Sequence, residues 1–356
     1  MKFFSIIGNI IESIAQTYLL EGSIATIKEV AKKAGVSVST VSHVVNKTRF
    51  VSDHLRNKVL SVIERLEYQP NQIARSLRRK SSNSLGLIIA DITNPFFSEM
   101  ARSIDYHSFM QNYSIILCNS GGNKEKEALY INRWSEWQVD GIIIVSSSLP
   151  PYHLSSLSKP EMPITLVDMD CPGYTMDSIS VDNFSGGKLA AEHLISLGHK
   201  RIACIYGSLD TKYKQERVNG FRAAMNEAGI EVEEPLIARA DFDIGSSMNV
   251  ALRLLEMENR PTAIFVCGDL MAYGAMQAAF IKDLKIPDDL SVVGFDDIYI
   301  SKYTLPPLTT VKQPIDEMAE EAVKCFLGRR EDPGKTSRIV KLNPQLEIRS
   351  STAPLM

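Results

Sequence analysis

The chain has few residues that would mark a disulfide-linked or metal-binding protein. Its 356 residues include only five cysteines, with no Cys-x-x-Cys motif and no histidine pair nearby. Three of them, Cys118, Cys204 and Cys267, lie in apolar runs typical of strands. We therefore expect buried free thiols in a reducing compartment, with neither disulfides nor a metal, and no cofactor.

Motifs of common enzyme classes are also missing. There is no G-x-G-x-x-G after an apolar run, no G-x-x-x-x-G-K-[ST], no G-x-S-x-G and no H-E-x-x-H. These motifs hold a dinucleotide, a nucleoside triphosphate, a catalytic serine and zinc, respectively. We expect that the protein is not an enzyme. An enzyme on a dinucleotide-type fold is the alternative, and detectable turnover of a bound sugar would support it.

Net charge is low, at −3, which by itself argues against a nucleic-acid partner. The distribution of charge reverses that conclusion. Residues 25–80 hold twelve basic and four acidic side chains, a net charge of +8, whereas residues 81–356 carry −10. A basic segment joined to an acidic body is expected where one domain contacts phosphates and another does not.

The segment from Ala25 to Ser52 has the pattern helix, tight turn, helix. Thr26 and Glu29 have the spacing of a capping box, which predicts a helix beginning at Ile27. Gly35 ends this helix, because glycine adopts the left-handed conformation without steric cost. One face of the helix is apolar: Ile27, Val30, Ala31 and Ala34.

Ser37 is expected to cap the second helix, which runs to Asn46. Val41, Val44 and Val45 should pack against the first helix, and the outward face is then polar except for one valine: Val38, Ser39, Thr40, Ser42 and His43. A helix of this kind fits the major groove of DNA. The alternative is an ordinary helical hairpin with a solvated Ser/Thr face.

The next segment favours DNA. Ser52 should cap a third helix, roughly from Asp53 to Glu67, which Pro70 prevents from continuing. A short helix-capable run, NQIARSLRRK, follows at residues 71–80.

ATIKEVAKKAGVSVSTVSHVVNKTRFV followed by YQPNQIARSL resembles the lactose/galactose/purine repressor (LacI/GalR) family of bacterial transcription regulators. The resemblance covers nearly the whole chain from Ala25 onward. It implies base reading by Val38, Ser39 and His43, and an approach of Arg49 to the phosphates. The full set of DNA-binding residues that it implies is Thr26, Val38, Ser39, Thr40, His43, Asn46, Arg49, Asn71, Ile73, Ala74 and Leu77. Within the hinge helix, Leu77 is implied to be a wedge in the minor groove.

Residues 1–24 lie outside the family pattern. Apolar residues at helical spacing occur here, but Asn9 and Glu12 interrupt them and no clear cleavage site follows. We rank an assigned start codon placed too far upstream first, an amphipathic docking helix second and a signal peptide third.

After a polar linker at residues 81–84, the apolar pattern changes. Short apolar runs alternate with helical stretches, as in LGLIIAD, YSIILCN and GIIIVSS, and the alternation repeats after Val181. This pattern is typical of parallel sheets covered on both faces. The expected fold is an all-α helix-turn-helix headpiece with a hinge helix, joined to an α/β bilobal core of the periplasmic-binding-protein type.

The expected domains are a non-family extension at 1–24, the headpiece at 25–70, the hinge helix and linker at 71–84, and the core at 85–356. Within the core, one lobe takes 85–183 and 311–342, and the other takes 184–310 and 343–356.

Ligands of open parallel sheets bind beyond the carboxyl ends of the strands. Carboxylates, an arginine and phenylalanines follow the strands here, a set that suits a sugar, because aromatic rings stack on C–H groups and charged groups bind hydroxyls. The resemblance to ribose-type binding proteins and repressors implies these effector residues: Asn94, Phe96, Phe97, Asp168, Arg217, Phe242 and Asp296. For each residue the alternative is structural, with Phe97 and Phe242 in a core and Asp91 or Asp297 capping a helix.

Departures from the family pattern leave the effector open. Gly268 replaces an asparagine of sugar binders, and Met169 replaces a second arginine of ribose-binding proteins. Gly268 is closer to the purine repressor, yet Thr211 takes the place of that repressor's purine-contacting arginine. A pentose or related sugar such as ribose is favoured, and a purine is the alternative.

The resemblance implies a cytoplasmic regulator that binds a palindromic double-stranded DNA operator as a homodimer and has no membrane partner. In this family, sugars usually release DNA, whereas the purine type does the reverse. The ending EIRSSTAPLM lacks the leucine heptads of a tetramerising coiled coil. A transport-type binding protein without DNA function is a remote alternative, because it leaves Ala25 to Lys80 unexplained.

Overall fold

The computed structural model describes residues 25–68, 81–171, 173–207 and 212–355. Of residues 212–214 it describes only the backbone. The chain forms two compact units, one ending at Ser82 and the other beginning at Asn83, and each is described by itself. The predictions for residues 1–24 and for the hinge helix at 71–80 fall outside the described residues.

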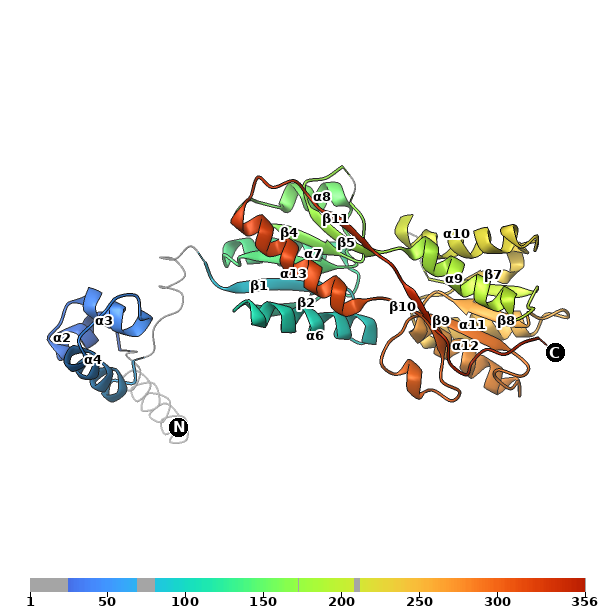
Figure 1. The fold of residues 1–356 in the computed structure, drawn as a ribbon, viewed down its shortest axis with the longest axis horizontal. Coiled ribbons are helices and arrows are strands. Elements are labelled where there is room, and N and C mark those ends of the chain that lie inside the picture. Colours follow the sequence, from blue (N-terminus) through green and yellow to red (C-terminus); the bar gives the residue numbers. More distant parts are fainter. Residues whose placement is uncertain (1–24, 69–80, 172, 208–211, 356) are drawn as a thin grey trace, which may run out of the picture. The chain divides into compact units, whose positions relative to one another are not determined.

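The described part of the first unit is a bundle of three helices, α2 (Ile27–Ala34), α3 (Val38–Asn46) and α4 (Asp53–Arg65) (Figure 1). Thr26 and Glu29 form the predicted capping box, in which the Thr26 N–H donates to Glu29 Oε2 at 2.7 Å. Gly35 follows α2 with φ of 61°, in the left-handed region. The core between the helices is largely aliphatic: Val30, Ala31, Ala34, Val41, Val44, Val51, Val59 and Val62.

The third helix, α4, differs from the sequence prediction at both ends. Ser52 occupies the N-cap position of α4, but its side chain makes no capping hydrogen bond. The helix also ends at Arg65, before the predicted Glu67, because Glu67 adopts φ of 47°. A non-glycine residue in the left-handed region cannot continue a right-handed helix.

The second unit contains two six-stranded sheets. The first has the order β11-β5-β4-β3-β1-β2, and all its neighbouring strands are parallel. Its strands are β1 (Ser84–Ile89), β2 (Ser114–Asn119), β3 (Gly141–Val145), β4 (Ile164–Val167), β5 (Asp177–Val181) and β11 (Ile339–Leu342). Its helices are α6 (Pro95–Met110), α7 (Lys124–Glu136), α8 (Pro151–Leu157) and α13 (Ile315–Glu331).

The second sheet has the order β12-β10-β9-β8-β6-β7, parallel except for β12 against β10. Its strands are β6 (Ile202–Tyr206), β7 (Ile237–Arg239), β8 (Ala263–Val266), β9 (Ser291–Asp296), β10 (Thr309–Lys312) and β12 (Gln345–Glu347). Its helices are α9 (Asn183–Ser196), α10 (Lys212–Glu227), α11 (Ile244–Leu255) and α12 (Asp269–Ile281), with the short 3-10 turns η1 (Glu234–Leu236) and η2 (Ser301–Tyr303).

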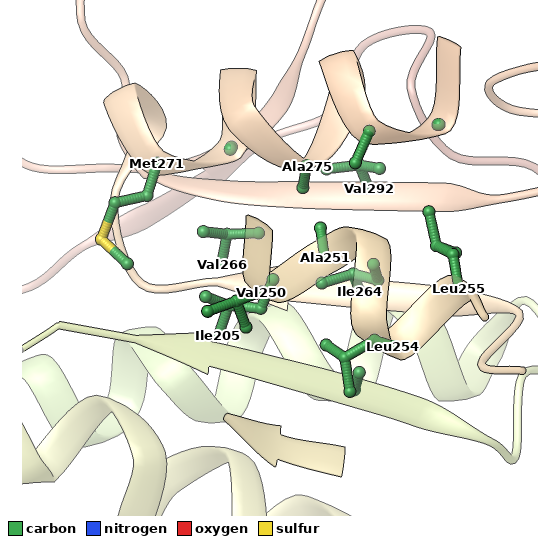
Figure 2. Packing of buried hydrophobic residues seen from close by; sticks show 14 of the residues in the cluster. Ile205, Val250, Ala251, Leu254, Leu255, Ile264, Val266, Met271, Ala275 and Val292 are labelled. Carbon is green, nitrogen blue, oxygen red and sulfur yellow. The ribbon is translucent and has the colours of Figure 1, made fainter. Parts of the chain in front are cut away.

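Each sheet has a separate hydrophobic core on each face. Along β1, Leu87 belongs to the core under α6 and α13, whereas its neighbour Ile88 belongs to the core under α7. In the second sheet, Figure 2 shows Val250, Ala251 and Leu254 of α11 packed over Ile205 and Ile264. Two apolar faces explain why these strands are continuous apolar runs. The expected doubly wound lobes are confirmed.

The chain passes between the lobes three times, after β5, after β10 and after β11. The second sheet keeps β10 as far as Lys312, so this crossing lies slightly beyond the boundary expected at residue 310. The four cysteines buried in these lobes are free, as is the half-buried Cys118. In the part of the chain that the structure describes, no helix is long and apolar enough to cross a bilayer.

Candidate functional site

The outward face of α3 is the first candidate site. Val38 and Ser39 are exposed at its beginning, and Arg49 is exposed in the loop that follows. Ser37 Oγ accepts from the Thr40 N–H at 3.1 Å and fixes the helix start that presents them. Small side chains there leave room for base edges in a major groove.

Three other predicted DNA-binding residues are partly engaged within the headpiece. His43 Nδ1 shares a hydrogen bond of 2.9 Å with Thr48 Oγ1, which leaves the other ring nitrogen for an external partner. Asn46 donates its amide to the Ser42 carbonyl at 2.8 Å. The Thr26 hydroxyl is held by Glu29 in the capping box. Of the residues predicted on the outward face of α3, Thr40, Ser42 and His43 are half-buried, and so is Asn46. Asn71, Ile73, Ala74 and Leu77 lie outside the described residues.

The second candidate site is a cavity of about 290 Å³ to which both lobes contribute residues. All seven predicted effector residues line it: Asn94, Phe96, Phe97, Asp168, Arg217, Phe242 and Asp296. The structure therefore brings together side chains that are up to 202 positions apart in the sequence. Their role as effector ligands remains a prediction.

Three strand ends reach this cavity with an unusual backbone. Ser146 after β3, Asp168 after β4 and Asp296 at the end of β9 have φ of 53°, 57° and 111°. Such conformations are strained for residues other than glycine and concentrate at ligand-binding sites. The turns aim the side chains across the carboxyl ends of the sheets, and Ser146 Oγ donates a short hydrogen bond to Asp168.

Arg217 on α10 is held by several groups of the second lobe. Its Nε donates to Asn183 Oδ1 at 2.7 Å, and its Nη1 donates to the Cys267 carbonyl at 2.8 Å. Its guanidinium lies 3.6 Å from the ring centre of Phe295. Gly187 permits this arrangement, because a Cβ there would lie 1.9 Å from the Arg217 carbonyl oxygen.

Asp296 is the buried carboxylate next to Arg217. Its Oδ1 accepts from Gln313 Nε2 at 2.8 Å and lies 3.4 Å from Arg217 Nη1. Burial raises the pKa of Asp296 to about 6, although Arg217 and Gln313 favour its charged form.

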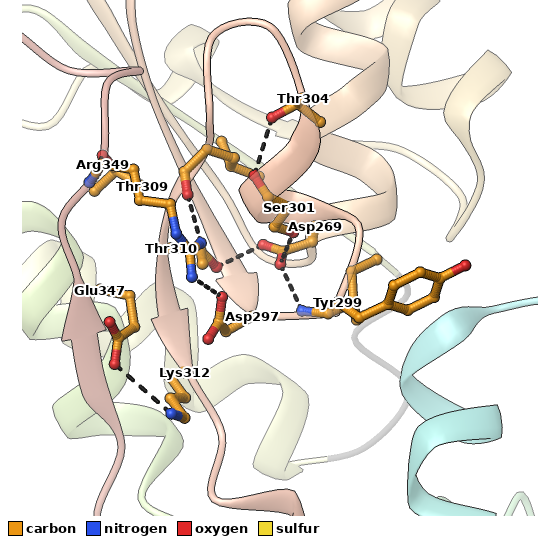
Figure 3. Close-up of polar contacts among 12 residues, drawn as sticks. Asp269, Asp297, Tyr299, Ser301, Thr304, Thr309, Thr310, Lys312, Glu347 and Arg349 are labelled. Carbon is orange, nitrogen blue, oxygen red and sulfur yellow. Dashed lines mark hydrogen bonds and ion pairs between the residues drawn. The ribbon is translucent and has the colours of Figure 1, made fainter.

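A second carboxyl group, Asp269, lies behind Asp296. It accepts from Ser301 Oγ at 2.6 Å, from Thr310 Oγ1 at 2.5 Å and from the backbone N–H of Ile298 at 3.0 Å (Figure 3). Burial raises the pKa of Asp269 well above its ordinary range, and the charge on Asp296 adds to the effect. The bonds to Ile298 and Ser301 fix the segment that directly follows Asp296, the last residue of β9.

The aromatic residues divide between cavity and core. Phe242 is 41% exposed, whereas Phe97 is half-buried and packs against the core beneath α6, and both line the cavity. Phe96 is 4% exposed and belongs to the core beneath α6. Gly207 makes room for the ring of Phe242, because a Cβ at Gly207 would lie 2.2 Å from it.

Sequence reasoning missed several lining residues, namely Ser146, Asn183, Tyr206, Cys267 and Gln313. All five lie within two positions of the end of a strand, so a rule that searches the ends of strands could have included them. Among the described residues no cluster of His, Cys, Asp or Glu could hold a metal ion.

Two family models match parts of this chain. Residues 26–71 match the family model "Bacterial regulatory proteins, lacI family", and residues 191–352 match "Periplasmic binding protein-like domain". The HTH-type transcriptional repressor PurR of Vibrio atlanticus (strain LGP32) is 38% identical over 332 residues, which cover 93% of this chain and 99% of that protein. The chain belongs to the lacI family of bacterial regulatory proteins.

Solved structures of lacI-family members agree. The lac repressor dimer bound to operator and the anti-inducer ONPF has a TM-score of 0.82 at 28% identity, covering 92% of this chain and 99% of that one. A regulator from Enterococcus faecium with bound ribose has a TM-score of 0.69 at 31% identity, covering 77% of this chain and 100% of that one. The chain is therefore a DNA-binding transcriptional repressor of this family.

Proposed function

We propose that this repressor binds a near-palindromic operator as a homodimer and that a small molecule in the cavity controls its affinity for DNA. The observation that carries the proposal is the cavity itself, to which seven residues predicted from the sequence contribute from both lobes. A molecule that contacts both lobes changes the equilibrium between their arrangements only by its differential affinity for them. It would act through Asp168 and Phe97 of one lobe and through Arg217 and Phe242 of the other.

The effector is a small sugar such as ribose, and a purine is the alternative. Half-exposed aromatic rings beside carboxylates support a sugar, as does the bound ribose of the Enterococcus faecium relative. The PurR relatives favour a purine. By the family pattern, a sugar would release the operator and a purine would promote its binding.

Exposed apolar side chains support the homodimer. Tyr106, Phe109 and Met110 on α6 are 59%, 72% and 59% exposed, and their spacing places them on one side of the helix. Leu117 on the edge strand β2 is 40% exposed. Apolar clusters of this kind mark protein contact surfaces, and we infer a second copy because the lac repressor relative is a dimer on its operator.

The proposal places the protein in the cytoplasm, as a protein without catalytic activity or cofactor.

Operator binding is tested by selecting genomic fragments with the purified protein, with and without ribose or hypoxanthine. An enriched palindrome that is lost with ribose supports the sugar, and one strengthened by hypoxanthine supports the purine. Absence of any enriched palindrome contradicts operator binding by this chain.

A further inference from the structure

The amino ends of the strands in the first lobe lie opposite the cavity. Strand β1 ends at Ile89, and Ala90 and Asp91 directly after it line the cavity. Its first residue, Ser84, is also the last residue of the polar linker at residues 81–84. Figure 1 shows β1 beginning at the end of this lobe that lies away from the second lobe. A signal from the cavity therefore has to cross the whole lobe before it reaches the linker.

Asp140, the residue before β3, contacts the linker at this end of the lobe. It is 3% exposed, and its Oδ2 accepts from the backbone N–H of Asn83 at 3.0 Å. Its own N–H donates to the Ser84 carbonyl at 2.9 Å. Its Oδ1 lies 3.1 Å from Nη1 of Arg330, in the last turn of α13. One buried carboxylate thus joins the linker to α13, and hydrogen bonds to a charged group are stronger than neutral ones.

The backbone of Asn83 is held in an unusual conformation. Its φ of 50° lies in the left-handed region, which asparagine adopts more readily than most residues other than glycine. Its carbonyl oxygen accepts from the N–H of Ser114, the first residue of β2, at 2.9 Å. Because its N–H and its carbonyl are both bonded to the lobe, the direction in which the chain leaves the core is fixed at this residue.

A second buried ion pair at the same end of the lobe provides a comparison. Asp177, the first residue of β5, is 3% exposed and accepts from Arg329 Nη2 at 3.0 Å and from the Arg338 N–H at 2.7 Å. Arg329 and Arg330 are neighbours in the last turn of α13, so the two ion pairs have the same chemistry. The bonds of Asp177 join parts of the lobe to one another, whereas Asp140 also binds the linker.

We propose that Asp140 is a positioning residue for regulation, which anchors the linker to the first lobe so that a movement of the lobe reaches the headpiece. The inference rests on the proposed function in that it takes the cavity as the site of control. A loose attachment would absorb the movement of the lobe. Loss of the anchor should therefore leave binding of a small molecule in the cavity unchanged and weaken its effect on the operator.

Hydrogen exchange of the full-length, ligand-free protein tests the anchor. Asp140→Asn keeps the size of the side chain and removes its charge, so the Asn83 amide should exchange about tenfold faster, as expected for loss of one hydrogen bond to a charged group. Asp177→Asn is the matched control. It should lower the unfolding temperature by a similar amount and leave the Asn83 amide at the wild-type rate. Equal rates in wild type and Asp140→Asn overturn the proposal.

DNA binding tests the consequence for function, on the palindrome obtained by genomic selection and on a random duplex. Asp140→Asn should lower the ratio of palindrome affinity to random-DNA affinity about tenfold, because loosely attached headpieces must be ordered when they bind. A change in palindrome affinity caused by ribose or hypoxanthine should shrink about fivefold, the lower end of usual coupling between sites. Asp177→Asn should keep the wild-type values. An unchanged ratio in Asp140→Asn, or equal losses in both variants, overturns the proposal.

Asn83→Val is a second variant, which keeps the test decisive if Asp140→Asn does not fold. The Asn83 side chain is exposed, so its replacement leaves the core of the lobe unchanged. A β-branched residue disfavours φ of 50°, so the chain should lose its fixed direction at this position. The ratio of palindrome to random-DNA affinity should fall as in Asp140→Asn, and a wild-type ratio contradicts the proposal.

The exchange measurement contains no DNA, so this inference and the proposed function can fail separately. A protein that enriches no palindrome loses the proposed function, and the exchange rate of Asn83 still decides whether Asp140 anchors the linker. A protein that enriches a palindrome and shows wild-type exchange in Asp140→Asn keeps the proposed function and loses the inference.

Discussion

Glu99 and Tyr299, 200 positions apart, join the two lobes of the core: Glu99 Oε1 on α6 accepts from the backbone N–H of Tyr299 at 2.8 Å. The preceding residue, Ile298, is 1% exposed and belongs to the core beneath α6 and α13, although β9 before it belongs to the second sheet. The segment therefore connects Asp296 in the cavity to the first lobe within three residues. Any change in lobe arrangement must alter this contact or move with it.

Glu99→Ala should loosen this connection. The substitution removes the acceptor, so the Tyr299 amide should exchange its hydrogen about tenfold faster, as expected for loss of one hydrogen bond to a charged group. Hydrogen exchange on the ligand-free protein measures this directly. Glu99→Gln keeps a carbonyl oxygen at the same place and should preserve most of the protection. Equal exchange in wild type and Glu99→Ala would show that the bond does not hold the lobes together.

Arg217→Ala should abolish the effector response. It leaves Asp296 buried without its cationic partner, and breaking a buried ion pair by removing one partner costs about 3–5 kcal/mol in general. We therefore expect a lower unfolding temperature together with loss of the dose response of operator binding. Arg217→Lys keeps the charge but not the planar donor set, and it should restore stability more than it restores the response. An unaltered dose response would remove Arg217 from the site.

The raised pKa of Asp296 predicts a pH dependence of stability. Its value of about 6 in the folded protein lies above the ordinary 3.8, so the folded chain binds more protons between these values. The free energy of unfolding contributed by this group should therefore fall as the pH rises from about 4 to about 6, by up to about 3 kcal/mol. The groups that face it are Arg217, Gln313, Asp168 and Asp269.

Urea unfolding at pH 4, 5, 6 and 7 checks this prediction by comparing wild type with Asp296→Asn. The pKa of Asp269 shifts in the same direction, and the charge of Asp296 contributes to that shift. The difference between the two curves therefore reports on Asp296 together with its effect on Asp269. The free energy of unfolding of the variant should increase relative to that of the wild type as the pH rises. Parallel curves would show that Asp296 titrates at its ordinary value.

Local patterns in the sequence predicted the headpiece well because its signals act over a few residues. Thr26 and Glu29, which form the capping box, are three positions apart. Gly35 adopts the left-handed conformation because it has no Cβ. Ser52 shows the limit of such reasoning, since a capping residue type stands at the right position without making the bond. Whether a side chain forms a local bond depends on rotamers that the sequence pattern does not specify.

The cavity residues were predicted by a rule about strand ends, combined with the family resemblance. The rule found Asp168 and Asp296 because parallel strands present their carboxyl ends at one edge of a sheet. It could not find the hydrogen bond between Glu99 and Tyr299 or the contact of Gln313 with Asp296, which depend on how distant segments pack.

Leu77→Ala tests the hinge residue that the family resemblance implies. A wedge inserted between base pairs supports a bent operator, so its loss should weaken specific binding by a few kcal/mol. Binding to random DNA depends on phosphate contacts and should keep its affinity and its dependence on salt. Leu60→Ala, which truncates a leucine 47% exposed on α4, serves as the matched control and should leave both affinities near wild type. Fluorescence anisotropy on operator and random duplexes measures the two, and equal losses on both would show that Leu77 contributes to general DNA contact and not to bending.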